Sequence, residues 1–163
     1  MGVSESFEPE STVHGGALPP KLSLDDRVSC AMNLRRALSE RDIIPFVGVY
    51  DVFPASLVAR HCDGMFFSGF EFAASHYGLP DVGFIAWSDM VAFVRRVKNI
   101  FPRHFLMVDI DDGYFDVEVA CHVVTRLEAM GAEGVILEDQ RRPRRCGHFD
   151  GKQLMDLPSF LTK

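Results

Sequence analysis

Three carboxylates follow two apolar runs of the sequence, at points where strands are expected to end. Asp109 and Asp111 stand two residues apart after one run, and Glu138 closes the next run. The carboxyl ends of neighbouring parallel strands meet at one edge of a sheet, so these side chains are expected to lie together. Oxygen ligands of this kind suit hard divalent cations. The spacing predicts a Mg²⁺ site, with Mn²⁺ as a second choice, or else acidic residues that only solvate the loops.

A thiol between charged neighbours is the second feature that could do chemistry. Cys146 follows Arg144 and Arg145 and precedes Gly147 and His148, in a stretch of polar residues. Nearby cations stabilise a thiolate, so this cysteine is a candidate acid, base or nucleophile. One Cys near one His is a weak signal, and a bystander thiol in a polar loop is the alternative.

The elements that must position these residues alternate between short apolar runs and helical patterns. Strands are expected at 43–49, 64–68, 105–109 and 135–137. Helices are expected at 23–39, 54–62, 88–101 and 116–130, with one or two turns over 71–76, a polar loop at 139–152 and a final helical turn from Pro158. Strands of this apolar kind, alternating with helices, predict right-handed βαβ units and a parallel sheet.

Four such units are visible, whereas a closed eight-stranded barrel typically needs about 250 residues. The expected fold class is therefore α/β, of the (β/α)8 TIM-barrel type, with about the first four βα units and a preceding helix in these 163 residues. Residues 1–22 are rich in Gly, Pro, Ser and Glu and are expected to be a flexible tail. Residues 23–163 form the expected partial barrel domain. Its unpaired strand edges predict association into homo-oligomers, unless the chain is a fragment.

Composition excludes several classes of function. The formal net charge of −6 argues against nucleic-acid binding, because no basic excess replaces the counterions of the phosphate backbone. No apolar stretch reaches the roughly 20 residues that a membrane helix needs. The four cysteines form no C-x-x-C pair, which favours reduced thiols and a cytoplasmic location. Cys30, Cys62 and Cys121 fall in helical patterns and are expected to be packed core thiols.

Several short motifs occur in a fixed order along the chain. They are Gly48-Val-Tyr50-Asp51, Phe67-Ser-Gly69, Ala73-Ala74-Ser75, Gly78-Leu-Pro-Asp81-Val-Gly83, Asp109-Ile-Asp111-Asp-Gly-Tyr114, Gly131-Ala132, Glu138-Asp-Gln140 and Pro143-Arg-Arg-Cys-Gly-His148-Phe-Asp-Gly-Lys152. In order and spacing, this series resembles the isocitrate lyase/phosphoenolpyruvate mutase superfamily over roughly residues 34–161. The collinear series is far more specific than any one of its elements.

The resemblance implies a Mg²⁺-dependent barrel enzyme that forms or breaks a bond beside a 2-oxo-acid enolate. The metal would lie near Asp109, with Asp81, Asp111 and Glu138 contributing directly or through water. Cys146 would be the proton donor or acceptor, and its thiol is expected to titrate close to working pH. His148 and Arg145 would be the other catalytic residues. Substrate-binding residues would be Tyr50, Ser68, Gly69, Asp81, Arg144 and Gly147.

The chain resembles those family members that have Cys-Gly-His in this loop. Such members are commonly carbon–carbon lyases of small hydroxy di- and tricarboxylates, such as isocitrate or 2-methylisocitrate. Oxaloacetate hydrolases and carboxyphosphonoenolpyruvate mutases are similar too, and the resemblance implies dimers or tetramers. Two departures bear on the substrate: Phe115 stands where Gly is usual, and Arg144 stands where Lys is common. An alternative of another class is a non-catalytic half-barrel that acts as an assembly or interaction protein.

Overall fold

The computed structural model describes residues 34–163, so the expected tail at 1–22 and the first part of the helix expected at 23–39 lie outside the described residues. Residues 34–40 are helical. The elements that follow are β1 (Phe46–Val49), α2 (Val52–Val58), β2 (Gly64–Phe67), α3 (Gly69–Phe72), the π-helix η1 (Ala73–Tyr77), α4 (Trp87–Ile100), β3 (Phe105–Asp109), α5 (Val117–Ala129), β4 (Gly134–Ile136) and α6 (Leu157–Thr162).

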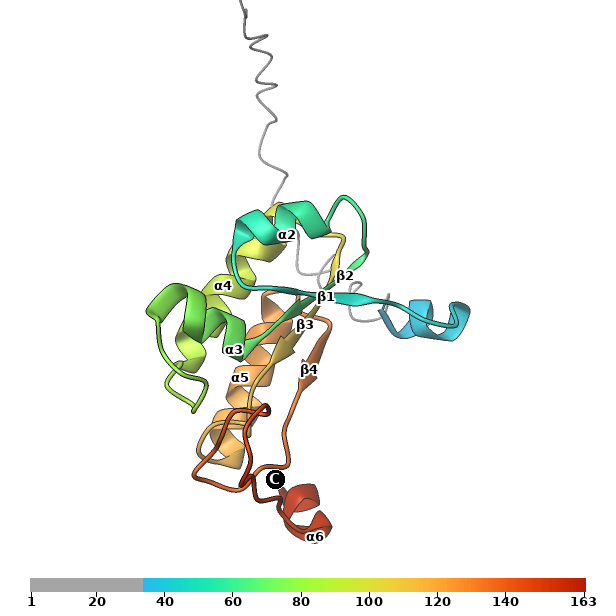
Figure 1. Ribbon diagram of the computed structural model, residues 1–163. Coiled ribbons are helices and arrows are strands. Elements are labelled where there is room, and N and C mark those ends of the chain that lie inside the picture. Colours follow the sequence, from blue (N-terminus) through green and yellow to red (C-terminus); the bar gives the residue numbers. More distant parts are fainter. Residues whose placement is uncertain (1–33) are drawn as a thin grey trace, which may run out of the picture.

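The four strands form one parallel sheet in the order β1-β2-β3-β4, and helices α4 and α5 lie on the same side of it (Figure 1). The expected parallel sheet of consecutive βα units is therefore confirmed. This α/β arrangement is the one expected for half of a (β/α)8 barrel.

The core lies between the sheet and these helices because alternate strand residues face them. Met65, Phe67, Leu106 and Val108 are fully buried. The ring of Phe67 stacks on Phe93 of α4, with 3.9 Å between ring centroids. Strand residues of the opposite face, such as Phe66 and Met107, are only half-buried, so the described chain covers one face of its sheet better than the other.

A buried ion pair ties the amino-terminal ends of β3 and β4 to α4. Lys98 Nζ lies 2.7 Å from Glu133 Oε1, with side chains 3% and 1% exposed. Glu133 Oε2 accepts a hydrogen bond of 2.7 Å from Leu106 N, and Lys98 donates to the carbonyl of His104 at 2.8 Å. The pair thus aligns the two strands that carry Asp109 and lead to Glu138.

Several expected boundaries and burials were wrong. Strand β1 begins at Phe46 instead of residue 43, and Ile43 is 80% exposed. Helix α2 begins at Val52 because the Asp51 carboxylate caps its first turn, and it ends at Val58. Ile100, whose place in the helical pattern of residues 88–101 predicts an inward-facing side chain, is 39% exposed at the end of α4.

The expectation that three cysteines are core thiols also fails where the structure describes them. Cys121 is exposed and Cys62 is half-buried, while Cys30 lies outside the described residues. Helical periodicity places a residue on a face but does not say how much of that face is covered. Within residues 34–163, no helix is long and apolar enough to cross a membrane.

Candidate active site

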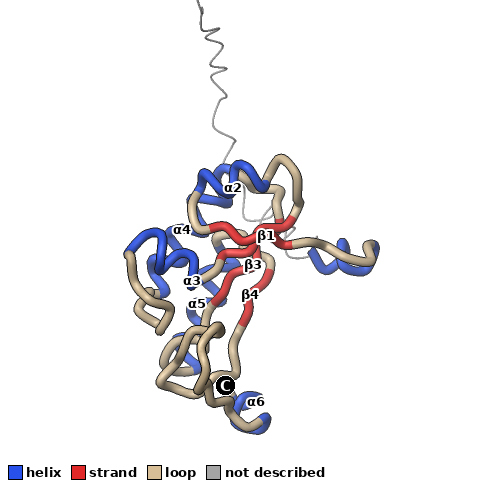
Figure 2. The backbone as a smooth tube through the Cα atoms, in the orientation of Figure 1, coloured by secondary structure: helices blue, strands red, loops and turns tan. Residues whose placement is uncertain are grey.

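The carboxyl ends of β3 and β4 bring the predicted acidic residues together. Backbone pairing continues past both strands, from Ile110 N to Ile136 O at 3.0 Å and from Glu138 N to Asp111 O at 2.7 Å. The long loop after β4 runs on from this end of the sheet (Figure 2). Asp109, Asp111 and Glu138 therefore stand at one edge, as their positions after the apolar runs predict.

Glycine at position 69 lets α3 approach these carboxylates closely. Gly69 N donates to Asp109 Oδ2 at 3.4 Å, and Asp109 Oδ1 accepts from Asp111 N at 3.0 Å. A Cβ on Gly69 would lie 3.2 Å from Asp111 Oδ1. Ser68 caps the same short helix by accepting a hydrogen bond from Glu71 N at 3.4 Å. Asp109 is thus oriented from two sides by backbone N–H groups.

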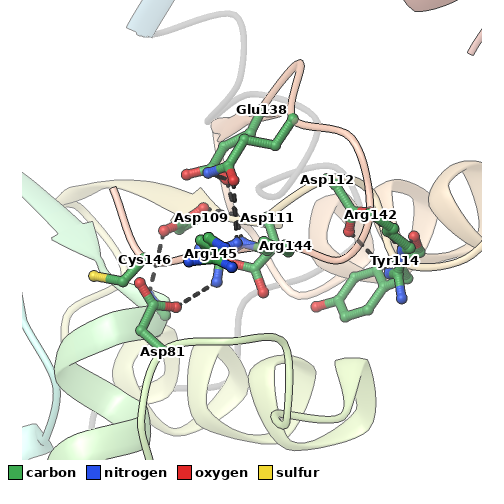
Figure 3. Close-up of polar contacts among 12 residues, drawn as sticks. Asp81, Asp109, Asp111, Asp112, Tyr114, Glu138, Arg142, Arg144, Arg145 and Cys146 are labelled. Carbon is green, nitrogen blue, oxygen red and sulfur yellow. Dashed lines mark hydrogen bonds and ion pairs between the residues drawn. The ribbon is translucent and has the colours of Figure 1, made fainter. Parts of the chain in front are cut away.

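Arg144 lies among three carboxylates that come from three segments of the chain (Figure 3). Its Nη1 lies 2.5 Å from Asp81 Oδ1 and its Nε lies 3.2 Å from Glu138 Oε2. Its Nη2 lies 2.7 Å from Asp111 Oδ1, an ion pair without hydrogen-bond geometry, since that oxygen is buried and accepts no hydrogen bond. The Arg144 side chain is only 4% exposed. The planar fork thus contacts each carboxylate with a different nitrogen.

Burial dominates the protonation of this cluster. It raises the pKa of Asp111 to about 7, against the opposing attraction of Arg144. Burial also raises the pKa values of Asp109 and Glu138, which Arg144 again opposes. For Arg144, burial lowers the pKa, but the hydrogen bond to Asp81 and the surrounding carboxylates outweigh it and the pKa is raised. The guanidinium therefore stays charged.

The thiol of Cys146 lies beside this cluster and is 3% exposed. Its Sγ is 3.4 Å from His148 Nδ1. Burial raises the pKa of Cys146, partly offset by the backbone N–H of His148 and reinforced by Asp81. The expectation that this thiol titrates close to working pH was therefore wrong, because burial and a neighbouring carboxylate outweigh the arginines. The group is a protonated thiol near neutral pH.

The donor chemistry at this edge fits a hard divalent cation, since every candidate ligand is a carboxylate oxygen. In the described residues, no three His, Cys, Asp or Glu side chains are already grouped closely enough to hold a metal. Arg144 separates three of the carboxylates, whereas no ion pair joins it to Asp109 within the described chain. Asp109 is therefore the carboxylate best placed to ligate a metal directly.

Residues 34–163 match the phosphoenolpyruvate phosphomutase family. The chain belongs to this family. It is 35% identical over 129 residues to the chloroplastic carboxyvinyl-carboxyphosphonate phosphorylmutase of Arabidopsis thaliana, a match that covers 78% of this chain and 38% of that protein.

Two solved structures show that the chain is similar to members of the wider PEP mutase/isocitrate lyase superfamily. One is 2,3-dimethylmalate lyase, described as a PEP mutase/isocitrate lyase superfamily member, with TM-score 0.75, 31% identity, and coverage of 82% of this chain and 45% of that one. The other is phosphonopyruvate hydrolase in complex with oxalate and Mg²⁺, with TM-score 0.66, 28% identity, and coverage of 71% and 40%. The resemblance to this superfamily and the partial-barrel fold are thereby confirmed. The chain spans less than half the length of these relatives.

Within this phosphomutase-family fold, the predicted site residues divide into two groups. Ion pairs and hydrogen bonds join Arg144, Asp81, Asp111, Glu138, Asp109 and Gly69. Cys146 lies beside Asp81 (Figure 3) and contacts His148, while Ser68 caps α3. Within the described chain, no side-chain hydrogen bond or ion pair joins Arg145, Gly147 or Tyr50 to this cluster; these three residues are exposed, as is His148. Arg144, which is predicted to bind substrate, contacts the carboxylates of Asp81, Asp111 and Glu138 in this structure.

Gln140, to which the sequence assigned no role, contacts both Glu138 and the backbone of the segment that carries Cys146. Its Nε2 donates to Glu138 Oε2 at 2.9 Å, and its Oε1 accepts from Arg145 N at 3.2 Å. Gln140 thus links a candidate ligand to the start of the thiol-bearing segment. Its place in the Glu138-Asp-Gln140 motif was the available signal.

A further group missed by the sequence lies around Asp112, which is 1% exposed. Arg142 donates to both of its carboxylate oxygens, at 2.6 and 2.9 Å. A cavity of about 630 Å³ opens between this pair and Arg144, with Phe84 and Tyr114 in its wall. The cavity adjoins the candidate site and extends toward the Gly78–Gly83 motif, which contains Asp81.

Proposed function

We propose that this chain carries the metal-binding and proton-transferring part of a Mg²⁺-dependent enzyme acting beside a 2-oxo-acid enolate. The preferred reaction is cleavage or formation of a carbon–carbon bond in a small hydroxy di- or tricarboxylate, such as 2-methylisocitrate or isocitrate. The chain covers 38% of the length of the Arabidopsis relative and 45% of that of 2,3-dimethylmalate lyase. The proposed reaction is therefore that of a whole enzyme of which this chain corresponds to a part.

The observation that carries the proposal is the convergence of four carboxylates and a protonated thiol at one sheet edge. Asp109 is proposed as the direct ligand, with Asp81, Asp111 and Glu138 near it. A bound Mg²⁺, or Mn²⁺, would neutralise the charge that develops on an enolate oxygen. The relative whose structure contains oxalate and Mg²⁺ supports this choice of metal.

The protonation of Cys146 supports the role of a proton donor. A general acid must hold its proton at working pH, and the buried thiol does so because its pKa is raised. His148, 3.4 Å away through Nδ1, is placed to orient the thiol and to exchange a proton with it. Ser68 and Gly69 would then face the oxo-acid end of the substrate, with Tyr50, Arg145 and Gly147 closing the pocket.

Two other reactions suit the same edge. A phosphorylmutase reaction is favoured by the Arabidopsis relative, and hydrolysis of an oxo acid is a second variant within the superfamily. We rank the phosphoenolpyruvate mutase reaction lower, because the resemblance implies that members with this activity usually lack the Cys of the Cys-Gly-His segment. In a different class, a non-catalytic half-barrel would use its two open strand edges for assembly.

The test is release of pyruvate or glyoxylate from 2-methylisocitrate, isocitrate, oxaloacetate and related acids, with Mg²⁺ or with a chelator. Chelator-sensitive product from this chain supports the enzyme and names the substrate class. Cys146→Ser should then lower turnover roughly 10²-fold or more, as removal of a general acid does. If neither this chain nor a version extended to the length of its relatives turns over any of these acids, the proposal is wrong.

We further propose that the protein acts in the cytoplasm as a homo-oligomer, a dimer or tetramer. Support comes from the sheet, whose edge strands β1 and β4 each pair with one neighbour in the described chain. Sedimentation velocity on the purified chain checks this, and a compact, stable monomer would contradict it.

A further inference from the structure

The segment that carries Cys146 has few regular contacts of its own. Residues 141–152 form no helix or strand, and most of their side chains are exposed. Arg144 and Cys146 are the buried exceptions. The bridge between Gln140 and Leu154 closes the base of the loop, so something else must hold its tip against the sheet edge.

Arg144 provides that attachment. Two residues before the thiol, it reaches Asp81 in the loop after η1, Asp111 after β3 and Glu138 after β4. Asp111 and Glu138 closely follow β3 and β4, and backbone hydrogen bonds beyond those strands hold them in place. Arg144 and Asp81 are 4% and 8% exposed, and Asp111 and Glu138 are 14% and 26% exposed. Charge-assisted contacts that are largely buried contribute more than exposed ones.

No other arginine of this loop is placed to make the contacts of Arg144 with the three carboxylates. Among the other arginines of the loop, Arg142 is bound to Asp112 and Arg141 to Asp156. Arg145 is exposed, and its guanidinium lies beside Gly151. A lysine at position 144 would present one compact ammonium, which cannot place three separate nitrogens on three carboxylates.

From this geometry we propose that Arg144 is a positioning residue for Cys146: it latches the thiol-bearing loop onto the carboxylates of the proposed metal site. The latch contacts protein carboxylates, and it acts on the reaction only through the placement of the thiol. It gives the carboxylates a second task, since the side chains proposed to surround the metal also hold the proton donor in position. Its functional meaning rests on the proposed role of Cys146, but the latch itself is measurable without turnover.

The test is the rate at which iodoacetamide modifies Cys146 in the folded chain, followed by mass spectrometry of the peptide. Modification requires the loop to open, so the rate reports the fraction of open loop. Arg144→Gln should raise the rate at Cys146 by about tenfold or more, the loss expected for charge-assisted hydrogen bonds. Arg144→Lys should fall between this variant and the unmodified chain, because it keeps the charge and loses the fork.

Two internal references separate a released loop from an unfolded chain. Cys121 is exposed and sets the intrinsic reaction rate, while half-buried Cys62 reports opening elsewhere. Under the proposal, Arg144→Gln changes the ratio of Cys146 to Cys121 and leaves Cys62 unchanged. Arg141→Gln removes the same charge from an exposed pair of the same loop and should leave all three rates within about twofold.

Glu138→Gln provides a second route to the same state, because it removes a carboxylate partner of Arg144 that lies outside the loop. It should also accelerate modification of Cys146. The proposal is overturned if Arg144→Gln leaves the Cys146 rate unchanged, or if Cys62 accelerates together with Cys146 in both variants. The latter pattern would make Arg144 a residue of general stability.

Discussion

Replacing Glu133 by leucine should destabilise the fold more than any exposed charge change, because it isolates a buried ammonium. Lys98 and Glu133 are 3% and 1% exposed, and the nitrogen and oxygen are 2.7 Å apart. The substitution leaves Lys98 with the His104 carbonyl alone and removes the acceptor of Leu106 N. Breaking a buried pair from one side costs about 3–5 kcal/mol. This is a large part of the 5–15 kcal/mol that typically stabilises a domain.

The double variant Lys98→Met with Glu133→Leu separates the charge from the packing. It removes both charges: Leu106 N loses its acceptor as in the single variant, and the His104 carbonyl loses its donor, which costs about 1–3 kcal/mol. No unpaired ammonium is left in the interior. The double variant should therefore be more stable than Glu133→Leu alone. Glu40→Gln is the matched control, since the Arg36–Glu40 pair is 73% and 59% exposed and should contribute less than about 1 kcal/mol.

Urea unfolding followed by the fluorescence of Trp87, the single tryptophan, and by far-UV circular dichroism measures these differences. Two results would refute the reasoning. One is a Glu133→Leu variant within about 1 kcal/mol of the unmodified chain, far below the cost of a broken buried pair. The other is a double variant that is no more stable than the single one.

Three further predictions concern the site. Asp109→Asn should abolish Mg²⁺ binding measured by calorimetry while the circular dichroism spectrum is kept; unchanged affinity would exclude Asp109 as the direct ligand. Burial raises the pKa of Cys146, so its alkylation rate should rise at higher pH than that of a cysteine in an unstructured peptide; a coincident or lower midpoint contradicts this. Gly113→Ala should cost about 1–3 kcal/mol, because its φ of 75° is unfavourable for a residue with a Cβ and that Cβ would lie 2.9 Å from Leu137 Cδ1 and 3.2 Å from Ala120 Cβ. The Cβ of Gly147→Ala would meet nothing within 4 Å, so this variant should keep the stability of the unmodified chain. Equal losses of stability in the two glycine variants would contradict the steric explanation.

The parallel sheet was predictable because its strands are short apolar runs separated by helical periods. The strand ends follow from the same pattern: Asp109 closes β3 as expected, and Glu138 lies just past β4. Backbone geometry then brings them together whatever their side chains do, which is why the acidic edge could be derived from spacing alone.

The partner of each long charged side chain could not be derived in this way. Lys98 and Glu133 are 35 residues apart in sequence, and a lysine in an amphipathic helix normally predicts a solvent-facing position. Arg144 has enough length to reach a substrate or a protein carboxylate, and only the fold shows that Asp81 lies within 2.5 Å. The sign of the Cys146 shift failed for the same reason, because burial depends on tertiary contacts.

The charge balance of the site gives the strongest physical argument for a divalent cation. Asp81, Asp109, Asp111 and Glu138 are opposed directly by Arg144 alone among the described residues. An anionic substrate brought to this edge would add negative charge beside carboxylates whose ionised form is already disfavoured by burial, which raises the pKa of Asp111 to about 7. Without more positive charge, repulsion would keep a di- or tricarboxylate away. Under the proposed function, a Mg²⁺ ion held by Asp109 would supply that charge and would also stabilise an enolate, so substrate binding and enolate stabilisation would have the same requirement.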